Sequence, residues 1–205
     1  MANEEIEREI EDSWEGEYQK TDISKLPWES FKPPSGLVKL IDSGAIKIGK
    51  ALDLGCGLGT NAIYLAKKGF DVFALDVSKT ALKCAEEKAK KSGVKINFVQ
   101  GFAHKISFPE KTFTLVFDRG CFHHIPKQTR KEYIENVHRI LADGGSYYLE
   151  CFCSKCGFDY GYRFSKTDIE NMFSGKFKII VIEELKNTDI SKKEIFLYSV
   201  FMEKM

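Results

Sequence analysis

The stretch ALDLGCGLGTN, residues 51–61, decides the fold of this 205-residue chain. An apolar run ends on an acid at Asp53, three glycines follow at alternate positions from Gly55, and the residues after Thr60 suit a helix. Strand, tight turn and helix in that order form the first unit of a nucleotide-type α/β sheet. Glycine suits the turn because a Cβ would obstruct both the sharp bend and the close approach of a ligand.

The spacing of these glycines bears on which ligand the turn accepts. A dinucleotide fold places its third glycine three residues after the second, whereas here the interval is two and Thr60 holds the dinucleotide position. The carboxylate of Asp53 would repel a phosphate, but it suits a ligand that carries an ammonium. An acid followed by Gly-x-Gly-x-Gly resembles the first motif of the Rossmann-like S-adenosyl-L-methionine (SAM) methyltransferases. A dinucleotide site, or a glycine turn without a ligand, stays open as an alternative.

Composition and charge argue against several classes of partner. The 31 Lys and Arg against 30 Asp and Glu leave a net charge of +1, whereas a nucleic-acid partner would favour a basic excess. No run of about 18 apolar residues exists, so no membrane span is expected. The acidic N-terminus lacks the apolar core of a signal peptide, and the six scattered cysteines suit a reducing compartment. A cytoplasmic location is therefore expected.

Apolar periodicity predicts one α/β domain over residues 1–205, with an N-terminal helix and lid over 1–34 and a cofactor-binding core over 35–205. Strands that alternate with helices predict a three-layer, Rossmann-like, seven-stranded and mostly parallel sheet with an antiparallel C-terminal hairpin. Ser35 and Ser78 are expected to cap helices, and Pro126 to begin one. The expected strands cover 50–54, 71–76, 95–100, 113–117, 146–152, 176–185 and 194–202, and the expected helices 3–20, 36–43, 61–68, 79–92, 126–141 and 165–173.

A second acid stands at the end of the second expected strand. Asp76 follows Gly59 by 17 positions, close to the ~20 typical of the acid that binds ribose hydroxyls in such folds. A carboxylate that accepts both hydroxyls of a diol makes strong, charge-assisted hydrogen bonds. We therefore expect Asp76 to bind a ribose, with a simple strand-end turn residue as the alternative.

These elements together resemble a class I SAM-dependent methyltransferase from residue 36 to the C-terminus. A finer resemblance lies outside the shared core. The segment WEGEY (residues 14–18), followed by PW (residues 27–28), is similar to the N-terminal lid of the thiol, thiopurine and tellurite-resistance methyltransferases. Asn61 and the segment DRG (residues 118–120) are also similar to patterns in that group.

The resemblance implies a set of cofactor contacts. The methionine part of SAM would lie at the glycine turn, the ribose on Asp76, and the adenine beside Val77 and Phe102. An acid often follows the glycine at position 101 in this superfamily and binds the adenine amine, but Phe102 stands there and offers ring stacking instead. Trp28 would cover the site or, alternatively, fill an edge of the core. The implied cofactor-binding residues are Trp28, Asp53, Leu54, Gly55, Cys56, Gly57, Gly59, Asn61, Asp76, Val77, Ser78, Phe102, Ala103, Asp118 and Arg119.

Four residues are candidates for handling the methyl acceptor. The main task of such an enzyme is to align the nucleophile with the methyl carbon. Arg119 and Arg163 follow strand ends, where a cation would lower the pKa of a thiol acceptor, although each is alternatively a structural ion-pair partner. His123 and His124 would serve as a general base for an oxygen or nitrogen acceptor, or would pack the start of a helix.

Three cysteines near the fifth strand raise the question of a metal. Cys151, Cys153 and Cys156 have a ligand-like spacing, but a closed zinc site needs four ligands and a second Cys-x-x-Cys is absent. His123 or His124 would have to complete the set, or the thiols would bind a metalloid substrate such as arsenite. We predict no resident metal and treat the three as free cysteines.

The sequence thus predicts a SAM-dependent methyltransferase with a small-molecule acceptor. The finer resemblance favours a thiol or another chalcogen or metalloid compound. No Asn-Pro-Pro-Tyr or Asp-Pro-Pro-Tyr box follows the fourth strand, which argues against methylation of an exocyclic amine on a base. The alternatives are a small-molecule O- or N-methyltransferase, a nicotinamide-dependent oxidoreductase that uses the same turn, a SAM-binding protein without catalysis and a macromolecular methyltransferase.

Overall fold

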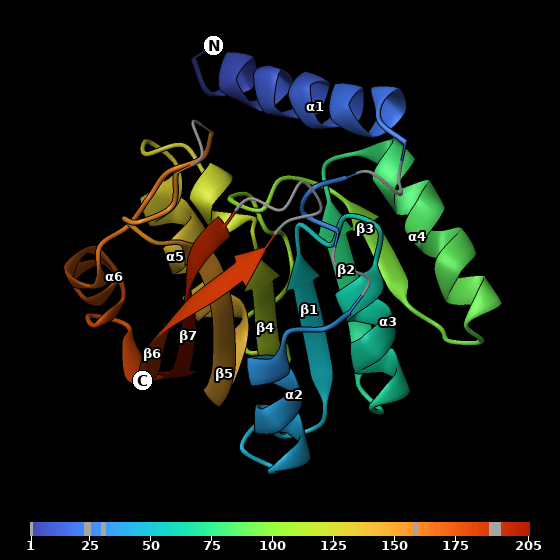
Figure 1. Ribbon diagram of the computed structural model, residues 1–205. Coiled ribbons are helices and arrows are strands. Elements are labelled where there is room, and N and C mark those ends of the chain that lie inside the picture. Colours follow the sequence, from blue (N-terminus) through green and yellow to red (C-terminus); the bar gives the residue numbers. More distant parts are fainter. Residues whose placement is uncertain (1, 23–25, 30–31, 158–159, 189–193) are drawn as a thin grey trace.

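A seven-stranded sheet in the order β3-β2-β1-β4-β5-β7-β6 is the middle layer of the protein (Figure 1). The computed structural model describes residues 2–22, 26–29, 32–157, 160–188 and 194–205. Strands β1 to β5 run parallel, and β7 is antiparallel to both of its neighbours, β5 and β6. The strands are β1 Lys50–Leu54, β2 Asp71–Asp76, β3 Asn97–Gln100, β4 Phe113–Arg119, β5 Leu141–Phe152, β6 Phe177–Thr188 and β7 Glu194–Lys204.

Helices cover both faces of this sheet because successive strand residues point to opposite sides. Ala51 packs with Leu37 of α2 on one face, whereas its neighbour Leu52 belongs to the cluster that contains Val137 of α5 and Phe173 of α6. The predicted three-layer α/β fold with an antiparallel C-terminal hairpin is therefore confirmed. The helices are α1 Ala2–Lys20, α2 Ser35–Asp42, α3 Thr60–Lys67, α4 Lys79–Lys91, α5 Arg130–Ile140 and α6 Lys166–Phe173, with a 3₁₀ turn, η2, at Phe122–His124.

Two of the expected helix starts were wrong. Pro34, not Ser35, holds the N-cap position of α2, and it makes no side-chain cap hydrogen bond. Pro126 does not begin a helix because the N–H and hydroxyl of Thr129 donate to its carbonyl, at 3.1 and 3.3 Å, and close a separate turn. The helix after that turn begins only at Arg130.

Strands β4 and β5, in the middle of the sheet, are both longer than predicted. Strand β4 continues through Asp118 to Arg119, two residues beyond the expected end. Strand β5 begins at Leu141, five residues early, because Leu141 pairs with Phe113 ahead of an irregularity in the β4–β5 register. The extension of β4 brings Arg119 opposite Glu150 of β5.

Helix α1 lies across the carboxyl ends of the strands, as Figure 1 shows, and is tied to the start of α4. Glu15 accepts hydrogen bonds from the Ser78 hydroxyl at 2.6 Å, the Thr80 hydroxyl at 2.6 Å and the Thr80 N–H at 3.2 Å. Burial raises the pKa of Glu15, but these donors outweigh it and lower the pKa to about 2. Ser78 caps α4 as predicted, since its Oγ accepts from the Ala81 N–H at 3.1 Å. Within the described residues, no helix has both the length and the apolar character that crossing a bilayer requires.

Candidate active site

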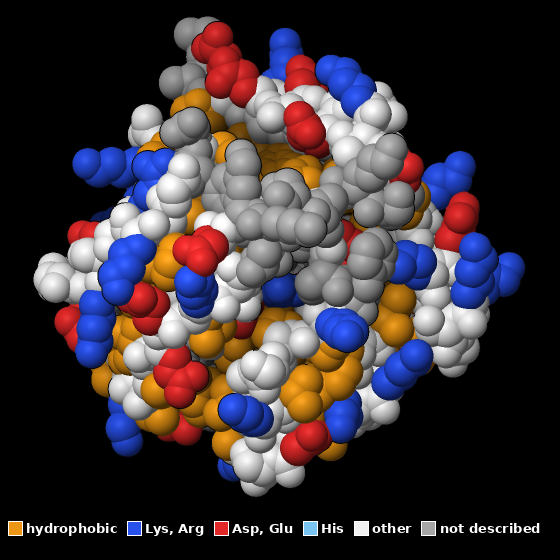
Figure 2. Space-filling model, in the orientation of Figure 1, with side chains coloured by type: hydrophobic (Ala, Val, Ile, Leu, Met, Phe, Trp, Pro, Cys, Tyr) orange, Lys and Arg blue, Asp and Glu red, His pale blue; other side chains and the backbone are white. Residues whose placement is uncertain are grey.

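A cavity of about 820 Å³ opens at the carboxyl ends of the strands, and residues of α1 form part of its wall. This volume is near the upper end for small-molecule sites and gives room for a cofactor and a second ligand. Its wall comes from α1 and the segment before α2, the turns after β1 to β4, the end of β5, and the β6–β7 hairpin. Acidic and basic side chains are interspersed over the face of the molecule seen in Figure 2. This face therefore carries no large patch of only positive or only negative charge.

The glycine turn after β1 forms one side of this cavity. Gly55 and Gly57 have φ values of 65° and 50°, in the left-handed region that favours glycine. A Cβ on Gly57 would lie 2.8 Å from the Tyr18 hydroxyl, and one on Gly55 would lie 2.7 Å from the Cβ of Cys121. The sequence requirement for glycine in this turn is therefore confirmed by both the backbone and its surroundings.

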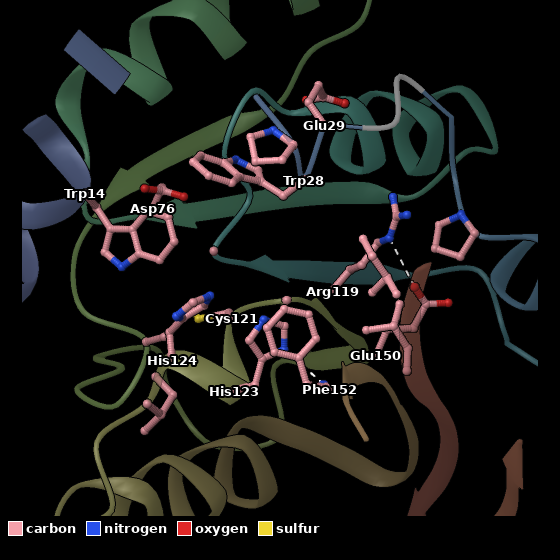
Figure 3. Close-up of a pocket in the computed structure, with 18 of the residues that line it drawn as sticks. Trp14, Trp28, Glu29, Asp76, Arg119, Cys121, His123, His124, Glu150 and Phe152 are labelled. Carbon is pink, nitrogen blue, oxygen red and sulfur yellow. Dashed lines mark hydrogen bonds and ion pairs between the residues drawn. The ribbon is translucent and has the colours of Figure 1, made fainter. Parts of the chain in front are cut away.

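Asp76 lies at the end of β2 on the wall of the cavity (Figure 3). Its two carboxylate oxygens accept the Gly57 N–H at 2.8 Å and the Ser78 N–H at 2.9 Å. Burial raises the pKa of Asp76, and the two N–H donors oppose that shift. Each oxygen keeps a second lone pair, so the carboxylate holds the turn and remains able to accept ribose hydroxyls.

Asp53 lies behind the turn and is 1% exposed. Its Oδ2 and the Oδ1 of Asn61 are buried without a hydrogen-bond partner among the described residues. Burial raises the pKa of Asp53 well above its usual range, and the nearby carboxylates of Asp118 and Asp76 add to the shift. Buried acceptors without a partner, close to other carboxyl groups, make this corner of the protein more favourable for positive than for negative charge.

Asp118 does not line the cavity and instead shapes the turn that follows β4. Its carboxylate accepts the N–H groups of Cys121 and Phe122, at 2.9 and 3.3 Å, and the Tyr133 hydroxyl. Burial raises the pKa of Asp118 to about 7. Cys121 of this loop therefore lines the cavity, whereas Asp118 lies behind the loop and holds its backbone.

Arg119 and Glu150 form a pair at the ends of β4 and β5 (Figure 3). The Nε of Arg119 donates to Glu150 at 3.0 Å, and the Tyr148 hydroxyl donates to the other Glu150 oxygen at 2.9 Å. The Ser199 hydroxyl donates in turn to Tyr148 at 2.9 Å. Glu150 is 2% exposed, and burial raises its pKa against the opposing effect of Arg119. Both partners line the cavity, so the guanidinium is held in one orientation at its wall.

His123 and His124 line the cavity, with Cys121 labelled between them in Figure 3, and carry no charge at neutral pH. Burial lowers the pKa of His124 to about 4 and that of His123 well below its usual range. The Nδ1 of His123 accepts the Phe152 N–H at 3.2 Å, and its ring stacks on the Phe152 ring at 3.7 Å between centroids. His124 contacts Trp14 edge to face at 4.8 Å. The two imidazoles therefore form part of an apolar, ring-lined wall.

The lowered pKa of His124 predicts a specific pH dependence of stability. The native protein binds fewer protons at this site than the unfolded chain, so stability is lost as pH falls from about 6.5 toward about 4. His124→Phe removes this titrating group. The free energy of unfolding that is lost between about pH 6.5 and 4 should therefore be smaller by roughly 2 kcal/mol in the variant. Urea unfolding of both proteins at intervals between pH 4.5 and 8 measures the difference. Parallel curves for the two proteins would contradict it.

Trp28 covers the cavity rather than filling a core edge. Its side chain is 38% exposed, and its Nε1 donates to the Tyr18 hydroxyl at 3.3 Å. Trp14 meets it edge to face at 5.6 Å. Glu29 follows it in the wall and accepts the Thr60 hydroxyl at 3.0 Å. Residues 23–25 and 30–31 of the predicted lid lie outside the described part of the chain.

The structure brings most of the predicted site residues together. A smaller cleft of about 60 Å³ adjoins the cavity at the glycine turn, and Arg119 lines both. Arg163 is exposed and is not part of the described lining, so the structure does not bring it to the cavity. The predicted residues that line either space are Trp28, Gly55, Cys56, Gly57, Asn61, Asp76, Val77, Phe102, Ala103, Arg119, His123 and His124. Those outside both described linings are Asp53, Leu54, Gly59, Ser78, Asp118 and Arg163.

Several wall residues were missed by the sequence analysis. Glu150 had a readable signal, because it is a lone charge in the apolar run SYYLECF (residues 146–152), and a buried charge needs a partner. The apolar residues of the β6–β7 hairpin gave no such signal. The missed wall residues include Glu29, Cys121, Glu150, Phe152, Tyr160, Leu185, Ile195 and Leu197.

The cysteines of the β5 loop are free thiols. Cys151, Cys153 and Cys156 are all buried. No cluster of three or more His, Cys, Asp or Glu side chains in the described part of the chain has the geometry to hold a metal ion. Burial raises the pKa of the Cys151 and Cys153 thiols.

A mostly parallel sheet of this order, with a glycine turn after β1 and an acid ending β2, is the arrangement of a Rossmann-like nucleotide-binding protein. Comparison with known proteins identifies the family. A family model described as a methyltransferase domain matches residues 51–145. An uncharacterized methyltransferase of Schizosaccharomyces pombe is 31% identical over 52% of this chain and 77% of its own length. The chain therefore belongs to the class I SAM-dependent methyltransferases, as the sequence predicted, and SAM is the cofactor of that family.

Two further similarities concern proteins with named small-molecule substrates. The 2-heptyl-1-hydroxyquinolin-4(1H)-one methyltransferase of Mycobacteroides abscessus is 29% identical over 70% of this chain, which spans 63% of that relative's length. The Burkholderia thailandensis 1,6-didemethyltoxoflavin-N1-methyltransferase, solved with 1,6-didemethyltoxoflavin and S-adenosylhomocysteine (SAH), superposes with a TM-score of 0.79 at 16% identity. That match covers 98% of this chain and 90% of the other, and it shows the shared fold.

Proposed function

We propose that this protein transfers the methyl group of SAM to a small-molecule acceptor rather than to a nucleic acid. The proposal rests on the continuity of the cavity. The cavity runs from Asp76, beside the glycine turn, to a second part whose wall is formed by Trp14, His124, Phe152 and Tyr160. We call this second part the acceptor half. A cofactor on the first side would present its reactive end to a ligand in the acceptor half.

The cofactor side has a partner for each part of SAM. Asp76 would accept the ribose hydroxyls while it holds the glycine turn through the Gly57 N–H. Asn61 lines the small cleft at the glycine turn, where the methionine part would lie, and Asp53 stands behind that turn. Phe102 lines the cavity after β3, where the adenine ring would stack against it.

The residues of the acceptor half position the acceptor and exclude water. When bound, SAM supplies a methyl group on a sulfonium, which a nucleophile attacks in line. Alignment of the two reactants supplies up to about 7 to 11 kcal/mol of rate acceleration at best. Trp14 and Trp28 cover the cavity, and Arg119, held by Glu150, places one positive group at its wall. The neutral His123 and His124 add no further charge there.

Two acceptor classes follow from different observations. A thiol or related chalcogen compound is favoured by the lid resemblance and by Arg119, since a nearby cation raises the thiolate fraction. An aromatic hydroxyl or ring nitrogen is favoured by the rings of His124 and Tyr160, which lie parallel at 6.1 Å between centroids. The names of the hydroxyquinolone and didemethyltoxoflavin methyltransferases agree with this second candidate.

Incubation with methyl-labelled SAM and a panel of acceptors tests the proposal. The panel holds thiols, selenite, tellurite, arsenite, phenols and heteroaromatic amines, and we expect label in one small product. Transfer to protein or RNA alone would contradict a small acceptor. Titration of tryptophan fluorescence with SAM and with NADH separates the oxidoreductase alternative, because Trp14 and Trp28 both line the cavity. Tight NADH binding without SAM binding would overturn the proposal.

A further inference from the structure

The wall of the cavity continues past the acceptor half, over the last two strands of the sheet. In the order β4-β5-β7-β6, strand β5 carries Phe152 of the acceptor half, and β7 and β6 lie beyond it, further from the cofactor side (Figure 1). Leu197 of β7 and Leu185 of β6 both line the cavity. The wall therefore extends in the direction that leads away from the cofactor.

Three side chains of this wall form a single row across the strands. Leu197 pairs with Phe152 on one side and with Leu185 on the other. The side chains of directly paired residues point to the same face of a sheet, and these three pack in one apolar cluster. Neighbouring strands lie about 4.8 Å apart, so the row spans about 10 Å. We call these three side chains the apolar row.

The apolar row suits a ligand that is itself hydrocarbon. None of its side chains offers a hydrogen bond, and Ile195, two residues before Leu197 on the same face of β7, widens it. The wall becomes polar at the edge strand, where Lys186 and Asn187 also line the cavity and the Lys186 ammonium pairs with Glu194 at 2.5 Å. A linear apolar chain of limited length matches this wall, because it leaves water without losing a hydrogen bond.

We propose that the methyl acceptor carries a linear apolar tail that lies along the apolar row, with its nucleophilic head in the acceptor half. The inference rests on the proposed function, because it assumes that SAM lies on the cofactor side. The methyl group then reaches the acceptor half from the side of β1 and β4. A tail over β7 and β6 directs the opposite end of the molecule toward that methyl group, so the row determines which end is methylated.

Binding of a homologous series to the SAH-loaded protein tests the tail without requiring turnover. The probes are the para-alkylphenols with straight chains from methyl to nonyl, titrated by calorimetry. Each buried methylene contributes a factor of about three to four in affinity. The Kd should fall by that factor per carbon until the chain reaches Leu185, and it should level off for longer chains.

A bulky residue at the outer end of the apolar row should shorten the chain that fits. Leu185→Trp should make the affinity level off at shorter chains, so that the long probes lose about tenfold, which corresponds to about two methylenes. The methyl and ethyl probes should keep the wild-type affinity. Ile180→Trp is the matched control on the same strand, since Ile180 is 44% exposed and outside the described lining. It should leave the dependence on chain length unchanged.

A second variant and two distinct failures keep the test decisive. If Leu185→Trp fails to fold, Leu185→Ala decides, and it should weaken only the long probes, by about fivefold. Affinity that does not depend on chain length, absence of binding by every probe, or a dependence that the folded Leu185 variants leave unchanged would overturn the tail site while SAH still binds. Failure of the wild-type protein to bind SAH would instead overturn the proposed function.

Discussion

Asp76→Ala should weaken the binding of SAH by at least about 100-fold. The carboxylate accepts the Gly57 and Ser78 N–H groups, and its remaining lone pairs would accept the ribose hydroxyls. Hydrogen bonds to a charged group contribute about 1.5 to 3 kcal/mol each, so two lost ribose contacts correspond to about 3 to 6 kcal/mol. The glycine turn also loses the acceptor that fixes it. Isothermal titration with SAH measures the change directly.

Asp71 at the opposite end of the same strand provides the matched control for Asp76. It is exposed, and its side chain contacts only Asn97 among the described residues, at 3.4 Å. Asp71→Asn should therefore bind SAH with the wild-type affinity. If Asp76→Ala kept its affinity within threefold of the wild type, the assignment of the cofactor side would be wrong.

Glu150→Ala should lower the free energy of unfolding by about 3 to 5 kcal/mol, the usual cost of removing one partner of a buried ion pair. The substitution leaves the Arg119 Nε and the Tyr148 hydroxyl without the acceptors that they have at 3.0 and 2.9 Å. The Tyr148 hydroxyl cannot replace this contact with water, since Tyr148 is 1% exposed, whereas the Arg119 side chain is 22% exposed at the cavity wall. Urea unfolding at pH 7 gives the difference.

Two further variants test whether this loss arises from the buried pair. Glu150→Gln keeps an acceptor oxygen and should recover part of the stability. Glu184→Gln breaks an exposed pair with Lys155, at 2.8 Å, and should change stability by less than about 1 kcal/mol. Equal losses for Glu150→Ala and Glu184→Gln would contradict the account.

The fold was predictable because its signals are local. The sequence around Gly55 and Gly57 demanded a turn that only glycine adopts easily, and their positive φ angles agree. The run DVFALD (residues 71–76) gave both a strand and the position of Asp76. The predicted ends of helices were wrong where a hydrogen bond within a turn decides them. At Pro126, for example, the carbonyl accepts from the Thr129 N–H and hydroxyl.

The site was predictable only where one short stretch of chain builds it. Asp76 and Gly57 lie 19 residues apart, and their meeting follows from the β1–turn–β2 order. Arg119 and Glu150 meet because β4 and β5 pair in a continuous register from Leu115 to Arg119, which no periodicity in the sequence reports. The contact of Glu7 with His104 joins residues 97 positions apart, and charge pattern alone did not indicate it.

The position of β7 has a consequence for how the chain reaches its native state. The last strand lies inside the sheet, paired on one side with β5 and on the other with β6. During synthesis, β6 therefore has no neighbour to join until residues 194–204 have left the ribosome. The first five strands can pair before β7 has been made, whereas the pairings of β7 with β5 and with β6 can form only after it.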